Sequence, residues 1–172
     1  MTAPALRDAS LAAVARARAV LAGVPDPEIP VLSLVDLGII RSVEVGPDGT
    51  VDVGVSPTYS GCPATAVIRA DVVAALEAAG FVGVRVRDVL SPPWTSDWIS
   101  ADGRRKLEDY GIAPPPVAVA RVRALAMPEA GPHCPRCGSE NTELLSEFGS
   151  TPCKALHRCR ACLEPFDRFK CI

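Results

Sequence analysis

The stretches Cys-Pro-Arg-Cys-Gly at residues 134–138 and Cys-Arg-Ala-Cys at residues 159–162 each hold two thiols separated by two residues. Two thiolates at this spacing bind one metal ion from a single tight turn, and two such turns complete the four-coordinate shell of a structural zinc site. The intervening segment is long enough to contain a β-hairpin. The sequence therefore predicts a zinc ribbon whose ligands are Cys134, Cys137, Cys159 and Cys162.

Two alternatives to a zinc site remain open at this stage. The cysteines could be free thiols or two redox pairs, but residues 133–172 are too few to bury a core without a metal or disulfides. Four thiolates also hold iron or an iron–sulfur cluster, so the pattern predicts a metal more strongly than it predicts zinc. His133 and His157 neighbour the two motifs, and we expect both to be surface side chains.

Composition limits the classes of function. The chain has 172 residues, of which 48% are hydrophobic, and its net charge is −2. This charge gives no electrostatic reason to expect nucleic acid or an anionic membrane as a partner. No apolar stretch is long enough to span a bilayer, and the first residues do not resemble a secretory signal, so we expect a cytoplasmic protein.

The N-terminal part alternates between helical and strand patterns. The hydrophobic spacing and the positions of glycine and proline predict helices and strands in turn, at residues 9–22 (helix), 39–45 and 51–55 (strands), 63–79 (helix), 82–86 (strand) and 99–110 (helix, capped by Ser100). A turn at residues 46–49 joins the first two strands as an antiparallel hairpin. We therefore predict an α+β fold, in which helices pack on a small three-stranded sheet, followed by a small all-β zinc ribbon. The position of the third strand stays open.

A proline-rich segment separates the two parts. Three consecutive prolines occupy residues 114–116, and an alternating pattern over residues 117–123 is compatible with one more strand. Proline-rich linkers are stiff and extended. The predicted domains are therefore an α+β domain at 1–112, a linker at 113–132 and the ribbon at 133–172.

One cysteine lies outside the ribbon. Cys62 precedes Pro63, the predicted first residue of the helix, and so is predicted at the N-cap. Helix N-termini stabilise thiolates, the form of cysteine that attacks electrophiles and binds metals. A buried structural cysteine is an equally supported interpretation. Asp36, which precedes the first strand, could cap a turn and have no other role.

Several motifs together resemble a known family. Asp-Pro-Glu-Ile-Pro at 26–30, Asp-Leu-Gly-Ile at 36–39, Gly-Cys-Pro at 61–63 and Pro-Trp-Thr at 93–95 resemble the metal–sulfur cluster assembly family, also known as the SufT-like or MIP-type domain. This match covers roughly residues 10–112. With the ribbon and its Phe-Gly-Ser-Thr motif at 148–151, nearly the whole chain resembles the D-subunit family of bacterial phenylacetyl-CoA epoxidases.

The resemblance implies a function and a site. It implies a role in assembling iron–sulfur clusters, with Cys62 as the reactive cysteine, Asp36 as an aspartate near it and Thr58 as the threonine upstream of it. A transient iron–sulfur cluster would be the second cofactor, beside structural zinc. The D-subunit pattern implies service to phenylacetate degradation, with the oxygenase, its iron–sulfur reductase or the cluster assembly machinery as partners.

Three functions are compatible with these features. The favoured one is a non-enzymatic assembly or delivery factor for the oxygenase and reductase components. The alternative is a structural or regulatory subunit of the oxygenase that never contacts a cluster. An enzyme that uses Cys62 as a nucleophile is the weakest of the three, because the N-terminal domain contains no histidine to act as its base.

Two accessory thiols, Cys153 and Cys171, are predicted to lie close together outside the zinc shell. The second cysteine motif should join two antiparallel strands at 155–158 and 165–169, which would bring Cys153 opposite Lys170 and Cys171. A register error of one residue would place the two thiols on opposite faces. They could form a disulfide, hold a second metal, assist cluster transfer or have no relation to each other.

Overall fold

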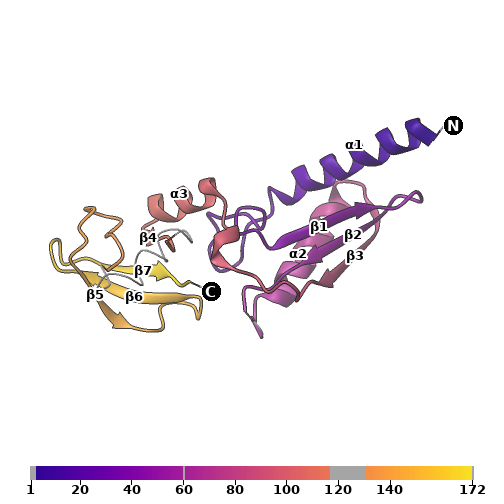
Figure 1. Ribbon diagram of the computed structural model, residues 1–172. Helices are drawn as coiled ribbons and strands as arrows, with labels where there is room; N and C mark the ends of the chain where they lie inside the picture. The colour runs from indigo at the N-terminus through magenta and orange to yellow at the C-terminus, as the bar shows by residue number, and fades with distance from the viewer. Residues whose placement is uncertain (1–2, 60, 117–130, 172) are drawn as a thin grey trace. The chain divides into compact units, whose positions relative to one another are not determined.

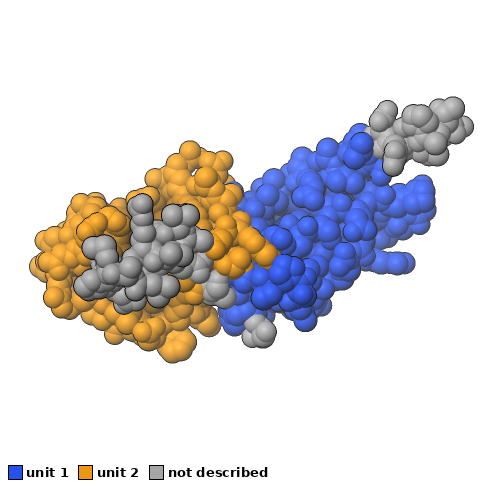
Figure 2. Space-filling model, viewed as in Figure 1, with its two compact units in different colours: residues 1–94 blue, residues 95–172 orange. Residues whose placement is uncertain are grey.

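The structure, a computed structural model, describes residues 3–59, 61–116 and 131–171. The chain forms two compact units, residues 1–94 and residues 95–172 (Figures 1 and 2). Each unit contains its own sheet, so the two are described separately. None of the helices in the described ranges combines the length and the apolar composition that crossing a bilayer requires.

The first unit contains a three-stranded sheet in the order β1-β2-β3, with strands Ile40–Val45, Thr50–Val55 and Val82–Asp88. β1 and β2 form the predicted antiparallel hairpin, and Gly49 occupies its turn with a φ of 82°. β3 pairs in parallel with β2, which places the third strand that the sequence left open. The parallel pairing requires a crossover, and helix α2 provides it.

Two helices cover the apolar residues of this sheet. α1 (Ala3–Leu21) contacts β1 and α2, while α2 (Thr65–Ala78) contacts β3 (Figure 1). Alternate residues of β2 are buried, and Leu21, Val72 and Leu76 are also fully buried. α2 is shorter than the predicted helix 63–79 because the chain makes a turn before Thr65.

Three loops converge at one end of this sheet. β1 begins beside the end of β2 because Ile40 pairs with Val55, and β3 ends there because Val55 pairs with Asp88. The loops before β1, after β2 and after β3 therefore start from the same edge. These loops carry the motifs at 26–39, 56–63 and 93–95.

The second unit contains a four-stranded sheet in the order β4-β7-β6-β5. A short 3-10 helix η1 (Ser96–Trp98) and helix α3 (Ala101–Asp109) precede it, and its strands are β4 (Ile112–Ala113), β5 (Thr142–Ser146), β6 (Lys154–Cys159) and β7 (Pro165–Phe169). Ser100 caps α3 as predicted, with its hydroxyl accepting from the Gly103 N–H at 2.9 Å.

The boundary between the compact units lies upstream of the predicted linker. β4 pairs in parallel with β7, and Arg104 of α3 donates to the carbonyls of Ser96 and Pro115, so residues 95–115 lie in the same unit as the ribbon. Most of the predicted linker, including the possible strand at 117–123, lies outside the described residues. The domain bounds 1–112, 113–132 and 133–172 stay a prediction, whereas the α+β fold class with a C-terminal all-β ribbon is confirmed.

Candidate metal centre and thiol site

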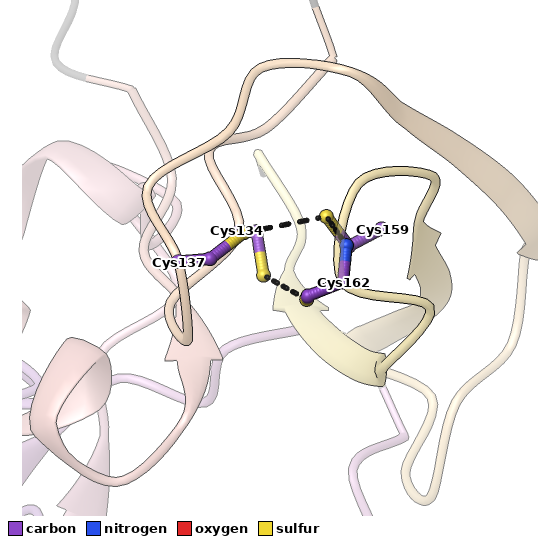
Figure 3. A group of neighbouring side chains, drawn as sticks. All are labelled: Cys134, Cys137, Cys159 and Cys162. Atoms are coloured by element: carbon purple, nitrogen blue, oxygen red, sulfur yellow. Dashed lines mark hydrogen bonds between the residues drawn. The ribbon is translucent and has the colours of Figure 1, made fainter.

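The structure brings the four cysteines of the two motifs together. One sulfur atom from each of Cys134, Cys137, Cys159 and Cys162 lies within 4.8 Å of the other three (Figure 3). The sulfurs of Cys134 and Cys162 are 3.7 Å apart, and those of Cys137 and Cys159 are 3.5 Å apart. These two contacts each link one motif to the other.

Both motifs form the same type of turn. In the first, the Gly138 N–H donates to the Cys134 carbonyl at 2.8 Å, and the Cys134 N–H donates to the Ser139 carbonyl at 3.0 Å. In the second, the Cys159 N–H donates to the Glu164 carbonyl at 3.0 Å. Both turns require a left-handed residue after the second cysteine.

That left-handed position is occupied differently in the two turns. Gly138 has a φ of 74°, and the corresponding residue of the second turn is Leu163, with a φ of 67°. Glycine adopts this conformation without steric cost, whereas a residue with a Cβ atom is strained there. The second turn therefore forms against a local conformational penalty, and the Leu163 side chain is 70% exposed.

An apolar cluster supports the thiols from one side. Ala113, Cys134, Cys159 and Phe166 form a buried group, and Cys162 packs against it. Ala113 belongs to β4, which the sequence predicts outside the ribbon, at the start of the linker. The core of the metal centre thus includes a residue from upstream of the proline-rich segment.

The electrostatics of the thiols are unequal. The backbone N–H of Cys162, which donates to the Cys159 sulfur at 3.5 Å, lowers the pKa of Cys159 to about 6. The backbone N–H of Glu164 lowers the pKa of Cys162, but burial and the neighbouring thiols outweigh it and raise that pKa to about 12. Adjacent thiolates repel one another, and a divalent cation among them removes that penalty.

The residues fit a tetrahedral metal ion. A zinc ion bound at about 2.3 Å from each of four thiolates in a tetrahedron holds its sulfurs about 3.8 Å apart. The observed separations of 3.5 and 3.7 Å, within an overall spread of 4.8 Å, are close to this value. The chain therefore has a four-cysteine metal-binding site.

Cys62 lies in a different environment. The prediction that it caps α2 is wrong, since the N-cap is Ala64 and the helix begins at Thr65. Pro63 and Ala64 form a turn instead, in which the Thr65 N–H donates to the Cys62 carbonyl at 3.2 Å. The electrostatic field of a helix N-terminus acts mainly within the first turn of the helix. Cys62 lies before the N-cap residue, so its position no longer gives a reason to expect a thiolate there. The side chain of Cys62 remains partly exposed.

Asp36 and Thr58 belong to the loops that meet at the same end of the sheet. Asp36 is buried, and its Oδ2 accepts from the Ser33 N–H at 3.0 Å and from the Ser33 hydroxyl at 2.9 Å. This carboxylate therefore organises the turn before β1, as the simpler of its two interpretations predicts. Thr58 is half-buried in the loop between β2 and Cys62.

Two further residues of this region were not predicted as site residues. The Trp94 indole N–H donates to the Leu37 carbonyl at 2.9 Å and thereby fixes the residue next to Asp36. Ser56 is 1% exposed, and its hydroxyl makes no hydrogen bond to any described residue. The Pro-Trp-Thr motif signalled Trp94, whereas nothing in the sequence singled out Ser56.

The strand pairing and the burial of the two accessory thiols are defined by the structure. Lys154 pairs with Phe169, and the Lys170 N–H donates to the Cys153 carbonyl at 2.9 Å. The register thus places Cys153 opposite Lys170, one residue short of Cys171. Cys153 is buried with its sulfur 3.0 Å from the Thr151 hydroxyl, and Cys171 is exposed. Their relation to each other stays a prediction.

One histidine differs from its prediction. His133 is exposed, as expected, with its Nε2 3.4 Å from Glu140. His157 is buried, because its position in the middle of β6 directs it inward, where it stacks on Phe166 at 5.7 Å between ring centroids. Burial, and then the charge of Arg168, lowers the pKa of His157 below its usual value.

Comparisons with known proteins agree with this division. The model of the iron–sulfur cluster assembly protein family matches residues 14–87, and the PaaD zinc beta ribbon domain matches residues 119–170. The putative D subunit of 1,2-phenylacetyl-CoA epoxidase from Escherichia coli (strain K12) is 51% identical over 154 residues, which cover 90% of each chain. The chain belongs to the phenylacetyl-CoA epoxidase D-subunit family. The resemblance noted in the sequence is thereby confirmed.

More distant similarities concern the first unit. An Fe-S protein maturation auxiliary factor of Porphyromonas gingivalis is 40% identical over 83 residues, or 48% of this chain and 78% of that protein. The crystal structure of a domain of unknown function from Bacillus anthracis superposes with a TM-score of 0.55 at 25% identity. It covers 59% of this chain and 96% of that domain. In this chain a region similar to iron–sulfur cluster assembly proteins thus precedes the ribbon.

Proposed function

We propose that this protein is an accessory factor of the phenylacetyl-CoA oxygenase system that assembles or delivers iron–sulfur clusters to the oxygenase and reductase components. It does not itself catalyse the oxygenation, and it works in the cytoplasm. Two similarities support this proposal. Similarity to a phenylacetyl-CoA epoxidase subunit relates the chain to phenylacetate degradation. Similarity to Fe-S maturation and cluster assembly proteins relates its first unit to cluster assembly.

The observation that carries the proposal is the single partly exposed thiol at the end of the first sheet. Cys62 follows β2 at the edge where the Asp36 turn precedes β1, and Thr58 lies between them along the chain. Cys62 is the only cysteine before residue 134. Iron–sulfur clusters are usually held by four protein ligands. A single thiol therefore favours transient binding of a cluster over permanent binding. A second molecule would supply the remaining ligands of the cluster.

The ribbon has the complementary role in this proposal. Four thiolates leave a zinc ion no open coordination position, so such a site stabilises structure and performs no chemistry. We propose zinc as its metal, and Cys134, Cys137, Cys159 and Cys162 as its ligands. The ribbon then offers a rigid surface that contacts the client protein.

A structural or regulatory subunit of the oxygenase is the second candidate, because the family name refers to a subunit. The two functions differ in what Cys62 does. An assembly factor loses its function when this thiol is removed, whereas a structural subunit tolerates the loss.

Anaerobic reconstitution with iron and sulfide separates the two candidates. We expect the full chain to bind iron and labile sulfide beyond its ribbon metal and to pass them to an apo iron–sulfur reductase. Cys62→Ser should abolish both, and Cys171→Ser, which removes another exposed thiol, should retain both. If Cys62→Ser transfers clusters as well as the wild type, the assembly function is refuted and the subunit function gains support.

A further inference from the structure

Two side chains of the ribbon sheet each contain a buried nitrogen atom without a hydrogen-bond partner among the described residues. One is the Nδ1 of His157 in β6, and the other is the Nε of Arg168 in β7. The His157 side chain is 5% exposed, and Arg168 takes part in no ion pair between described residues. Buried polar groups in folded proteins are nearly always hydrogen-bonded, so two such groups side by side indicate a ligand.

The strand pairing brings these two side chains to one face of the sheet. His157 pairs with Phe166, and Arg168 lies two residues beyond Phe166, so Arg168 is a diagonal neighbour of His157. Diagonal neighbours in an antiparallel pair lie within reach of long side chains. Burial, and then the charge of Arg168, lowers the pKa of His157, which agrees with this proximity.

The residues paired directly with Arg168 are small. They are Ala155 of β6 on one side and Ala113 of β4 on the other, and both are buried. Directly paired residues share a face of the sheet, so these two side chains are the nearest neighbours of the Arg168 stem. An alanine side chain offers the guanidinium neither a hydrogen-bond acceptor nor a negative charge.

No carboxylate of the described ribbon pairs with Arg168. The acidic residues between 131 and 171 are Glu140, Glu143, Glu147, Glu164 and Asp167. Glu140, Glu143 and Asp167 contact other basic side chains. Glu147 and Glu164 are exposed, and Glu147 acts on His157 more weakly than Arg168 does. The positive charge of Arg168 is therefore not compensated by a contact within the described ribbon.

A carboxylate satisfies these two groups better than a water molecule does. Water can accept a hydrogen bond from a buried N–H, but it leaves a partly buried charge unpaired, which is unfavourable. A carboxylate accepts two parallel hydrogen bonds from one edge of a guanidinium and keeps lone pairs for an imidazole N–H. Its single negative charge equals the charge of Arg168, whereas a phosphate group carries more than one at neutral pH.

We propose that Arg168 and His157 bind a small carboxylate on the face of the ribbon sheet that packs against the metal centre. The Arg168 guanidinium holds the two oxygens, and the His157 ring donates a third hydrogen bond. Because the ligand binds only the folded ribbon, it stabilises the ribbon by mass action. The site uses neither the four metal ligands nor Cys62, so it can be tested independently of the proposed function.

Titrations of the zinc-loaded full chain with sodium acetate, sodium phosphate and sodium chloride test this proposal. The Nε–H signal of Arg168 in nitrogen–proton correlation spectra, assigned by its loss in Arg168→Lys, reports binding at the guanidinium. The backbone amide of His157 reports it from the neighbouring strand. We expect acetate to shift both signals saturably and to bind more tightly than phosphate, whereas chloride at the same ionic strength should give no saturable shift.

Three variants make the test specific, with binding followed at the His157 amide. Arg168→Gln should weaken acetate binding about tenfold or more, the usual effect of losing a charged hydrogen-bond donor. Arg158→Gln is the matched control, because Arg158 pairs with Pro165 on the other face and contacts Glu143. Glu147→Gln should not weaken acetate binding, since it removes a nearby negative charge.

The titration of the wild type decides the proposal even if a variant does not fold. Acetate that gives no saturable shift beyond that of chloride would show that the two nitrogens are satisfied by water, and would overturn the proposal. Tighter binding of phosphate than of acetate, or an equal loss of acetate binding in Arg158→Gln and Arg168→Gln, would overturn it as well.

Discussion

Replacing Leu163 by glycine should tighten metal binding by the ribbon. Leu163 has a φ of 67° at the position where the first cysteine turn has Gly138 with a φ of 74°. The Cβ atom of leucine is strained in this conformation, and glycine is not. The Leu163 side chain is 70% exposed, so its removal sacrifices little packing.

The magnitude follows from two opposing terms. Left-handed backbone costs a residue with a Cβ atom roughly 1–2 kcal/mol. Glycine loses more backbone entropy on folding, which cancels about 0.5–1 kcal/mol of the gain. The net stabilisation is therefore about 0.5–1 kcal/mol, or roughly a two- to fivefold lower dissociation constant for zinc, because ribbon folding and metal binding are coupled.

Competition with a chromophoric chelator measures this change. Leu163→Ala is the control, since alanine keeps the Cβ atom and the strain while it removes the exposed side chain, and its zinc affinity should equal that of the wild type. Gly138→Ala should introduce the same strain into the first cysteine turn and weaken zinc binding. If Leu163→Ala tightens binding as much as Leu163→Gly, exposed leucine and not backbone strain is the cause, and the reasoning fails.

Trp94→Phe should lower the free energy of unfolding by about 1–3 kcal/mol in urea titrations, because the Leu37 carbonyl loses its indole donor; an unchanged midpoint would contradict this. Stripping the metal should remove hydrogen-exchange protection from β5–β7 and also from β4, while β1–β3 keep theirs; a protected β4 would show that it does not depend on the ribbon. The Thr50 hydroxyl, and then the Thr50 N–H, holds the pKa of Asp48 below 3.8, so its contribution to stability is present above pH 3.8 and is lost as the pH falls through the folded-state pKa. Asp48→Asn should therefore destabilise the β1–β2 hairpin near neutral pH, whereas in acid the hairpin of the variant should be as stable as that of the wild type. The temperature dependence of the amide signals of the hairpin measures this stability.

Much of the fold could be predicted because its signals are local. Alternating valines with a Gly-Pro-Asp-Gly turn determine the β1–β2 hairpin, and the Ser100 hydroxyl caps α3 through a contact three residues along the chain. The two cysteine motifs carry the metal geometry in their own spacing. Each of these features depends on neighbours in sequence, so the sequence alone is informative.

The features that could not be predicted depend on distant pairing. No local pattern shows that β3 would pair in parallel with β2, or that Ala113 would reach the metal core through β4 and β7. His157 was predicted at the surface because it lies beside a cysteine motif, but the register against Phe166 buries it. A register shift of one residue would have exposed it and brought Cys171 opposite Cys153.

The two thiol sites differ in a way that bears on how metal could move through this protein. At the ribbon, four sulfurs converge from two turns that are closed by their own backbone hydrogen bonds. All four metal–sulfur bonds would have to break before a competitor could remove a bound ion. At Cys62 one thiol stands on a loop, so a single exchange of ligands suffices to pass a cluster to a protein that presents its own thiolates. Exchange of iron is therefore expected at Cys62 and retention of zinc at the ribbon, even when both are exposed to the same apo-protein. A chase of zinc- and iron-loaded protein with excess apo-reductase, which follows both metals over time, would refute this division if zinc left as fast as iron.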